Sequence, residues 1–207
     1  MNFLSEELLA DTIMRLIGDV RHVAVGNASP IPATAALALR ERGGGKPYVS
    51  LLGSRKHMFF TDGGRELFDC AGQGRIDVFF LSGGEIDGEG NINLVSIGDY
   101  AQPNVHRTGG PIALVTNRCL FSFDRARKRF RLESVHPGHT VAEVIEHTGF
   151  DFDRPENVPA TPAPSDDTLR LMREVVGPQL AEVYPQFAAR VFGVPVIPAE
   201  RSESRNP

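Results

Sequence analysis

Cysteine and long apolar runs are both scarce in this chain of 207 residues. Its two cysteines, Cys70 and Cys119, lack the density and spacing of a disulfide framework or a zinc site. We therefore expect a reducing, cytoplasmic setting. No apolar run approaches the roughly 20 residues that a membrane-spanning helix needs. The acidic N-terminus also lacks the basic region of a secretory signal, so we expect no membrane association.

An excess of positive charge is missing as well. The chain carries 22 lysines and arginines against 26 acidic residues, and the basic side chains are dispersed. This pattern gives no electrostatic footprint for nucleic acid. The length suffices to bury a core, so we predict one domain over residues 1–197 and a disordered tail over 198–207. His136 and His139 flank a Pro-Gly turn without a carboxylate at ligand spacing, so we predict a surface loop and no metal site.

Alternating helical and strand patterns predict an α/β fold. We expect a mainly parallel open sheet with helices on both faces, followed by an antiparallel extension. The periodicity predicts helices at 6–17, 33–42 and 65–71 and parallel strands at 22–26, 48–52 and 76–81. Beyond Gly109, strands at 112–116, 119–123 and 129–135 follow one another without helices, which favours antiparallel pairing.

Several residues predict where helices begin and end. Ser5 and Ser165 are expected N-caps, and Thr140 with Glu143 matches a capping box for a helix that ends at Gly149. The pair Gly177-Pro178 is expected to interrupt the C-terminal helical pattern.

The segment at 82–100, with the sequence SGGEIDGEGNINLVSIGDY, crowds glycines, carboxylates and asparagines directly behind the apolar run at 76–81. In an open α/β sheet, ligands usually bind outside the carboxyl ends of the strands. Glycines at such a place let backbone N–H groups approach a ligand closely. The segment therefore indicates a small-molecule site.

This segment resembles the β-type subunits of the class I CoA-transferase family, in particular those of the glutaconate CoA-transferase type. The family pattern G-G-x-x-[VI]-D-x-x-G-N-x-N falls on Gly83, Gly84, Ile86, Asp87, Gly90, Asn91 and Asn93. The likeness continues at 96–100 and 147–153 and, more weakly, at 169–174. It implies the CoA-transferase fold, an α subunit as partner in a hetero-oligomer, and an acyl-CoA substrate held at the shared interface. It implies no cofactor, since coenzyme A is part of the substrate.

The sequence departs from the family at two places. The family attacks the thioester with a glutamate in an E-S-G type turn, and the matching strand here places Leu51 at that position. Leucine cannot act as this nucleophile. The family's glycine-rich oxyanion segment also lacks a clear counterpart, with Gly109-Gly110 as its candidate substitute. Losing one oxyanion donor typically costs about 2.7 to 4 kcal/mol of barrier lowering.

Glu85 is our first candidate for a catalytic acid or base on this chain. The alternative interpretation is a carboxylate that fixes its turn by accepting backbone N–H groups. The same alternative applies to Asp87, Asn91 and Asn93, because their short polar side chains favour turns. The predicted substrate-binding residues are Gly26, Asn27, Ser50, Gly53, Gly83, Gly84, Asn91 and Asn93.

Other patterns leave two interpretations open. The amides at Gly26-Asn27 could receive a carboxylate or thioester oxygen, or form a plain turn between strand and helix. Ser50 and His57 could form a nucleophile and base, although no glycine-flanked elbow surrounds the serine. A basic run could meet the phosphates of CoA or be a solvated hairpin; it comprises Arg125, Arg127, Lys128, Arg129 and Arg131.

The function that these patterns predict is that of a β subunit acting on an acyl-CoA thioester. The family transfers CoA between carboxylic acids. With Leu51 at the glutamate position, hydrolysis, carbon–carbon cleavage or decarboxylation are the reactions to consider, with the partner supplying an acid or base. The alternative is a non-catalytic scaffold or regulatory subunit of such a complex.

Overall fold

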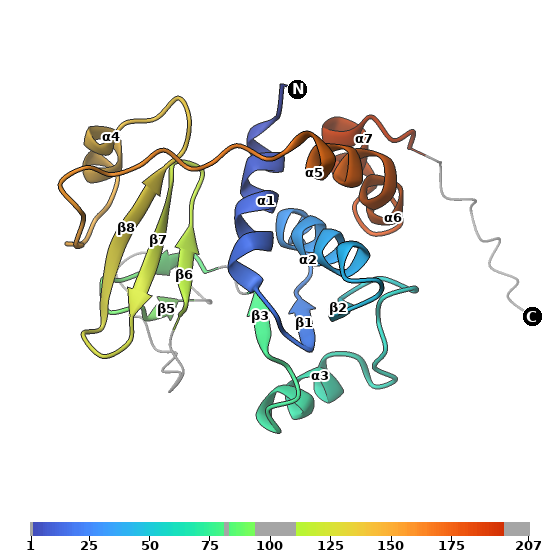
Figure 1. Ribbon diagram of the computed structural model, residues 1–207. Coiled ribbons are helices and arrows are strands. Elements are labelled where there is room, and N and C mark those ends of the chain that lie inside the picture. Colours follow the sequence, from blue (N-terminus) through green and yellow to red (C-terminus); the bar gives the residue numbers. More distant parts are fainter. Residues whose placement is uncertain (1, 81–82, 94–110, 197–207) are drawn as a thin grey trace, which may run out of the picture.

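The computed structural model describes residues 2–80, 83–93 and 111–196, and Figure 1 shows the arrangement of their elements. The N-terminal elements are α1 (Ser5–Ile17), β1 (His22–Val25), α2 (Pro30–Arg42), β2 (Tyr48–Leu51), α3 (Gly63–Gly72) and β3 (Val78–Phe80). Five strands follow: β4 (Glu85–Ile86), β5 (Ile92–Asn93), β6 (Ala113–Val115), β7 (Cys119–Asp124) and β8 (Arg129–Val135). The last elements are α4 (Val141–Glu146), α5 (Asp166–Arg170), the π-helical segment η1 (Leu171–Val176), α6 (Gly177–Leu180) and α7 (Pro185–Phe192). The predicted tail at 198–207 lies outside the described residues, as does the likeness at 96–100.

The parallel part of the predicted fold is confirmed. β1 lies between β2 and β3, and both neighbours run parallel to it. In the register, Val23 of β1 is opposite Val49 of β2 and Val78 of β3. Neighbouring parallel strands end at the same edge of a sheet, so β1, β2 and β3 all end on one side.

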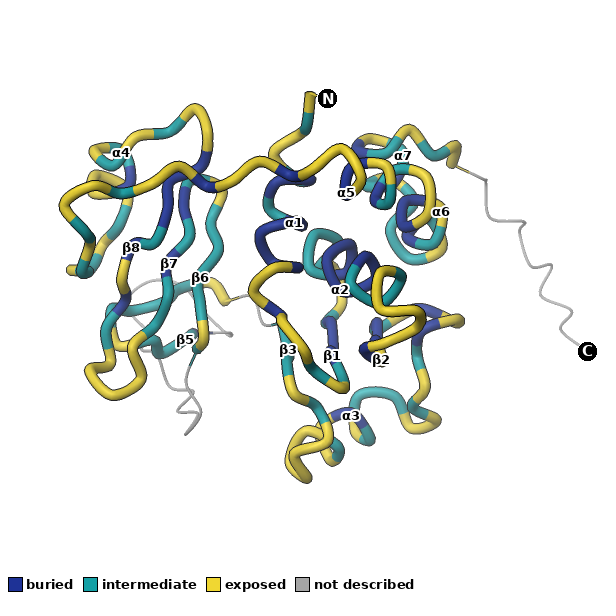
Figure 2. The backbone as a smooth tube through the Cα atoms, in the orientation of Figure 1, coloured by how far each residue is buried: buried dark blue, intermediate teal, exposed yellow. Residues whose placement is uncertain are grey.

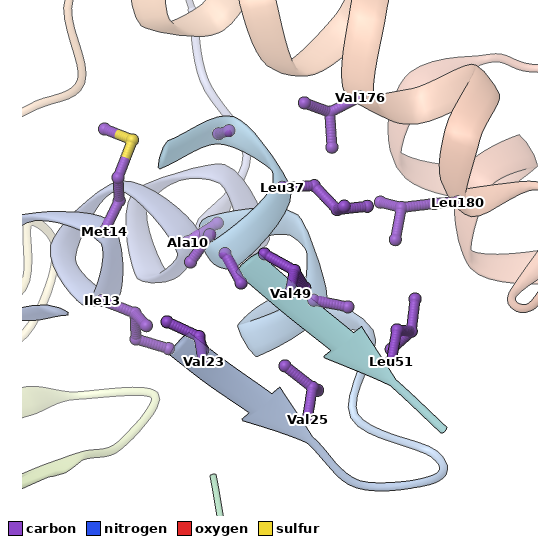
Figure 3. Close-up of a cluster of buried hydrophobic side chains, with 14 of the residues drawn as sticks. Ala10, Ile13, Met14, Val23, Val25, Leu37, Val49, Leu51, Val176 and Leu180 are labelled. Carbon is purple, nitrogen blue, oxygen red and sulfur yellow. The ribbon is translucent and has the colours of Figure 1, made fainter. Parts of the chain in front are cut away.

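One face of this sheet packs against α1 and α2. Alternate strand residues point toward the helices, and α2 offers mostly alanines, whose small side chains allow close approach. Figure 3 shows the resulting core, to which the C-terminal helices also contribute. Its buried members include Ala10, Ile13, Met14, Val23, Val25, Leu37, Val49, Leu51, Val176 and Leu180. The C-terminal helices are therefore part of the main core.

The opposite face of the sheet is buried as well. Ala24 and Ser50 point to this side and are completely buried. The ring of His22 covers them in part: its Nε2 lies 2.8 Å from the Ser50 hydroxyl, and it stacks on Phe60 with 6.1 Å between centroids. Burial on both faces is shown by the dark segments of β1 and β2 in Figure 2.

The antiparallel extension is confirmed too. β6, β7 and β8 form an antiparallel sheet in that order. A second core packs against it, built largely from phenylalanines whose ring centroids lie 4.8 to 6.3 Å apart. Those rings belong to Phe121, Phe123, Phe130, Phe150 and Phe152. Two arginines of the basic run, Arg127 and Arg129, form ion pairs with Asp153 at 2.6 and 2.8 Å.

The turn after β8 is exposed only in part. Pro137 and Gly138 are exposed, as a surface loop requires, but His136 is buried. Its two ring nitrogens lie 2.8 Å from the Thr161 hydroxyl and 3.0 Å from the Thr116 carbonyl. The prediction of a surface loop was therefore wrong for His136, because two distant segments provide partners that its sequence neighbours do not reveal.

Two of the three predicted caps are observed. The Thr140 side chain accepts the N–H of Glu143, and the Ser165 side chain accepts that of Thr168. The helix after Thr140 ends at Glu146, before the predicted Gly149. The prediction for Ser5 was wrong.

Leu4 is the N-cap of α1, and its N–H is bound by the Glu7 carboxylate at 2.8 Å. Glu7 is completely buried and also pairs with Arg173, at 2.6 and 2.8 Å. That distant contact fixes the start of the helix, and the Ser5 hydroxyl bonds to Glu6 instead.

The helical pattern was predicted to be interrupted at Gly177-Pro178, but the chain remains helical there. The helical path continues from α5 through η1 into α6, with one π-helical turn in front of the proline. Pro178 has no N–H to donate to the preceding turn, and the π-helical segment lies directly before it. Gly177 is needed for close packing, because a Cβ there would lie 2.8 Å from the Cβ of Phe192 in α7. Among the described residues, every helix is too short or too polar to cross a membrane.

Candidate functional site

The carboxyl edge of the parallel sheet carries two short loops. The first loop, 26–29, follows β1 and leads into α2, and the second, 52–57, follows β2. The segment that follows β3 begins at residues 81–82, which lie outside the described part. Gly26 and Asn27 belong to the first loop and Gly53 to the second. The structure thus brings these three predicted binding residues to the same edge.

The first loop has a strained, tightly held backbone. Ala28 has a φ of 55°, which is rare for a residue with a side chain. The Ser29 hydroxyl donates to the Asn27 carbonyl at 3.2 Å and does not cap α2. The Tyr184 hydroxyl joins both ends of the loop: it donates to the Gly26 carbonyl and accepts the Ser29 N–H, each at 3.4 Å.

The second loop closes on itself. The N–H of Leu51 donates to the His57 carbonyl at 2.8 Å, and the Ser54 hydroxyl accepts the N–H groups of Lys56 and His57. Gly53 has a φ of 88°, in the region that favours glycine. A Cβ at Gly53 would lie 3.2 Å from Oδ1 of Asn27, so the two loops also touch each other.

Of the two interpretations left open for Ser50 and His57, the nucleophile–base pair is not formed. Ser50 instead meets His22, whose other ring nitrogen lies 3.3 Å from the Arg75 carbonyl. The pairing follows from the register, since Ala24 is opposite Ser50 and places His22 diagonally across on the same face. Ser50 is completely buried on that face, so its hydroxyl is engaged away from the loops.

His57 is buried between the second loop and the helices. Burial is the main cause that lowers the pKa of His57, and nearby Arg40 lowers it further. Its Nδ1 is a buried nitrogen without a hydrogen-bond partner among the described residues. No cluster of three or more metal-ligating side chains occurs in the part of the chain that the structure describes.

The central segment forms the small hairpin β4–β5. Glu85 is opposite Asn93, whose amide donates to the Glu85 carboxylate at 3.3 Å. Asp87 accepts the backbone N–H groups of Glu89 and Asn91 and also the Asn91 side-chain amide. These are the bonds of a turn.

Glycines let this hairpin pack closely. Gly84 donates its N–H to the Asn93 carbonyl at 2.8 Å, and a Cβ at Gly83 would lie only 2.3 Å from Cγ2 of Ile92. Gly90, with a φ of 78°, lies against Phe123 of the antiparallel sheet. The contacts of the hairpin are therefore with the antiparallel part, whereas the two strand-end loops belong to the parallel sheet. Gly109-Gly110 lies outside the described residues.

Residues from the C-terminal helices reach both loops, and no sequence pattern pointed to them. Glu182 accepts the Ser54 hydroxyl at 2.9 Å and the Arg55 N–H at 2.8 Å. A hollow of about 400 Å³ lies beside the first loop. It is lined by Ala28, Pro30, Val183, Tyr184, Pro185, Gln186 and Phe187.

No protein-family model matches the chain. Among curated proteins it is similar to the B subunit of 3-oxoadipate CoA-transferase from Pseudomonas knackmussii, with 29% identity over 152 residues, 48% of this chain and 58% of that protein. The B subunit of glutaconate CoA-transferase from Acidaminococcus fermentans is 26% identical over 153 residues, 49% of this chain and 57% of that protein. The IpdB subunit of the cholesterol ring-cleaving hydrolase from Rhodococcus jostii is 36% identical over 66 residues, 32% of this chain and 26% of that protein. The chain thus spans little more than half the length of the first two relatives and less of the third.

Solved structures agree over nearly the whole chain. IpdAB of Rhodococcus jostii superimposes with a TM-score of 0.69, covering 94% of this chain and 100% of that one at 18% identity. Glutaconate CoA-transferase of Acidaminococcus fermentans gives 0.68, covering 94% and 99% at 20% identity. The chain has the fold of a class I CoA-transferase β subunit. The decarboxylase AibA/AibB shares this fold with a TM-score of 0.65, covering 93% and 100% at 19% identity.

In this CoA-transferase fold, the departure from the family pattern lies at the end of β2. The resemblance places the family's nucleophilic glutamate at Leu51, which is the last residue of that strand. Leu51 is completely buried in the main core, together with Val25 and Val49. Gly53, the glycine of the family turn, has a left-handed conformation. At this strand end the chain thus has a left-handed glycine two residues after a buried leucine.

Proposed function

We propose that this chain is the β-type subunit of a heteromeric enzyme that acts on an acyl-CoA thioester, with a separate α-type subunit as its partner. Support comes from the sequence similarity to two CoA-transferase B subunits and one hydrolase subunit, and from the shared fold. Two of the structural neighbours are described as a decarboxylase and as IpdAB, so the fold also occurs outside the transferases.

The observation that carries the proposed chemistry is the buried Leu51. A family transferase needs a carboxylate that forms an anhydride with the acyl group and then a thioester with CoA. A leucine buried in the core at that position can do neither. The complex therefore hydrolyses, cleaves or decarboxylates its acyl-CoA without covalent CoA on this chain.

Within the chain, the two strand-end loops are the proposed substrate-binding elements. Backbone N–H groups of Gly26, Asn27 and Gly53 lie at the edge where open α/β sheets bind ligands. Glu85 is the proposed acid or base, since it is half-buried and its carboxylate is held by the Asn93 amide at 3.3 Å. A positioned carboxylate of this kind typically contributes about 10² to 10⁴ in rate.

The test is turnover by the chain assembled with an α-type subunit from the same genome. A panel of acyl-CoA thioesters is incubated with the complex, with and without acetate or succinate, and the products are identified by mass spectrometry. We expect a hydrolysed, cleaved or decarboxylated product whose formation does not depend on the added acid. CoA appearing on the added acid would show a transferase and contradict the proposal.

The variant Glu85→Gln should keep the complex intact and reduce turnover roughly 10²-fold or more. Glu89→Gln is the matched control, because Glu89 lies exposed in the same hairpin turn. Unchanged turnover in Glu85→Gln would contradict its role and favour an acid or base supplied by the partner. A stable complex that turns over nothing across the panel would favour a scaffold or regulatory subunit.

A further inference from the structure

We propose that the C-terminal turn, residues 182–184 between α6 and α7, positions the two strand-end loops of the proposed substrate site. The inference rests on the proposed function for the role of these loops, while the contacts themselves are properties of the fold. Glu182, Val183 and Tyr184 each contact one or both loops. They act as positioning residues for the loops that would touch the substrate.

Glu182 holds the second loop through both of its carboxylate oxygens. Oε2 accepts the Ser54 hydroxyl at 2.9 Å and Oε1 accepts the Arg55 N–H at 2.8 Å. Burial is the largest single influence and would raise the pKa of Glu182, but these two bonds together with the nearby Lys56 and His57 hold that pKa below its usual value. The carboxylate is therefore charged at neutral pH, and bonds to a charged group are stronger than neutral ones.

The Glu182 carboxylate also decides how Ser54 can bond. A serine hydroxyl has one proton to donate and two lone pairs that accept. Since Glu182 takes the proton, both lone pairs are left for the N–H groups of Lys56 and His57, at 3.1 and 3.0 Å. One carboxylate thus orders the backbone of most of the second loop.

Tyr184 holds the first loop in a comparable way. Its hydroxyl donates to the Gly26 carbonyl and accepts the Ser29 N–H, both at 3.4 Å. These bonds join the two ends of the loop that contains the strained Ala28. Next to Tyr184, Val183 packs near Gly53, with its Cγ1 3.6 Å from where a Cβ would lie. The turn therefore contacts both loops at the place where they touch each other.

The turn is itself held rigidly by the helices on either side. The N–H groups of Val183 and Tyr184 both donate to the Leu180 carbonyl, at 3.0 and 2.7 Å. Leu180 is completely buried in the main core, and so is Ala188 of α7, whose N–H donates to the Tyr184 carbonyl. A rigid turn is what a positioning device needs, because a displacement of about 1 Å at a reacting group can cost 10²-fold in rate.

The experiment compares Glu182→Gln and Tyr184→Phe with wild type, using the full chain alone and in complex with its α-type partner. Hydrogen exchange by mass spectrometry reads the loops directly. In Glu182→Gln the side-chain amide nitrogen cannot accept, so one of the two bonds is lost. We expect the amides at 53–57 to exchange roughly tenfold faster or more. In Tyr184→Phe we expect a smaller acceleration, roughly fivefold, at 26–29.

Matched controls separate loop positioning from general stability. Glu174→Gln removes an exposed carboxylate from η1, and Tyr48→Phe removes a hydroxyl from an exposed tyrosine at the start of β2. Neither should change exchange in either loop. A merely structural role of the turn would instead raise exchange throughout the core and lower the melting temperature. Such a result in Glu182→Gln, or wild-type exchange in both loops of both variants, overturns the inference.

Kinetics then connect the turn to the site. In the complex we expect Glu182→Gln to lower kcat/KM by roughly tenfold to a hundredfold, through kcat more than through KM. Unchanged kinetics of Glu182→Gln, in a complex that turns over its thioester, would overturn the positioning role of the turn but leave the proposed function standing. If the wild-type complex turns over no thioester, the proposed function fails, and the exchange data still decide whether the turn orders the loops.

Discussion

At the scale of single residues, Gly53 is constrained both by its backbone conformation and by its contacts with neighbouring side chains. Its φ of 88° favours glycine, and its Cα faces Oδ1 of Asn27 and the side chain of Val183. The strand before it ends at Leu51, which the resemblance aligns with the family's nucleophilic glutamate. Under the proposed function, this strand end contacts the acyl-CoA without a covalent bond to it.

Gly53→Ala should lower the free energy of unfolding by about 1–2 kcal/mol, the usual cost of a left-handed alanine. It should also reduce kcat/KM of the complex, because the new Cβ would lie 3.2 Å from Asn27 and displace the first loop. Gly63→Ala is the control: Gly63 has a φ of 55°, and a Cβ there would meet nothing within 4 Å. Urea denaturation and steady-state kinetics measure the two effects, and equal losses of turnover in both variants would contradict the role of Gly53.

At the scale of elements, β1 and β2 are joined by more than their backbone ladder. The ring of His22 spans from the Ser50 hydroxyl of β2 to the Arg75 carbonyl before β3. Burial is the main cause that lowers the pKa of His22, and the charge of Arg75 adds to it, while the Arg75 carbonyl and the Asp77 carboxylate oppose it. The folded chain thus binds this proton less readily than the unfolded chain does.

The lower pKa of His22 in the folded chain determines how the free energy of unfolding changes with pH. Between the lowered pKa of folded His22 and the unfolded value of about 6.5, the unfolded state carries more protons. Stability from this group is therefore complete above about pH 6.5 and decreases as the pH falls below it. In His22→Gln, the pH dependence of the unfolding free energy in this range should become shallower. Urea titrations of wild type and His22→Gln at several pH values test this, and an unchanged slope in the variant would contradict it.

The sequence predicted the elements better than it predicted their partners. The strands of both sheets and the caps Thr140 and Ser165 depend on periodicity and on neighbours three residues away, which a sequence displays directly. The start of α1 was missed because Glu7 is fixed by Arg173, 166 residues further along the chain. The partner of Ser50 was missed because the choice of His22 depends on strand register, which no local pattern encodes.

In the candidate site, too, the local sequence revealed the loop positions but not the distant residues that contact them. Gly26, Asn27 and Gly53 were predicted from strand ends, because the crevice of a parallel sheet follows from its topology. Glu182 and Tyr184 carry no local signal, since their importance arises from contacts with residues at least 127 positions away. Glu182 is itself exposed, and only its bonds to the second loop distinguish it from an ordinary turn residue.

At the scale of the whole molecule, a parallel sheet with strand-end loops and an antiparallel extension with its Glu85 hairpin are joined in one chain. Val115 of β6 packs against the main core, and Arg15 of α1 donates to the carbonyl of Pro162 in the connector that crosses α1 in Figure 1. The C-terminal helices then return to the sheet edge. Core, loops and C-terminal turn thus meet at the end of β2, where Leu51 is the last residue of the strand.

The most direct test of this account is the intact mass of each subunit while the complex turns over an acyl-CoA thioester. We expect the thioester to be consumed while this chain keeps its unmodified mass, both before and after treatment with borohydride. An increase by the mass of CoA less one water, lost on borohydride treatment, would place a glutamyl-CoA intermediate on this chain and contradict the account.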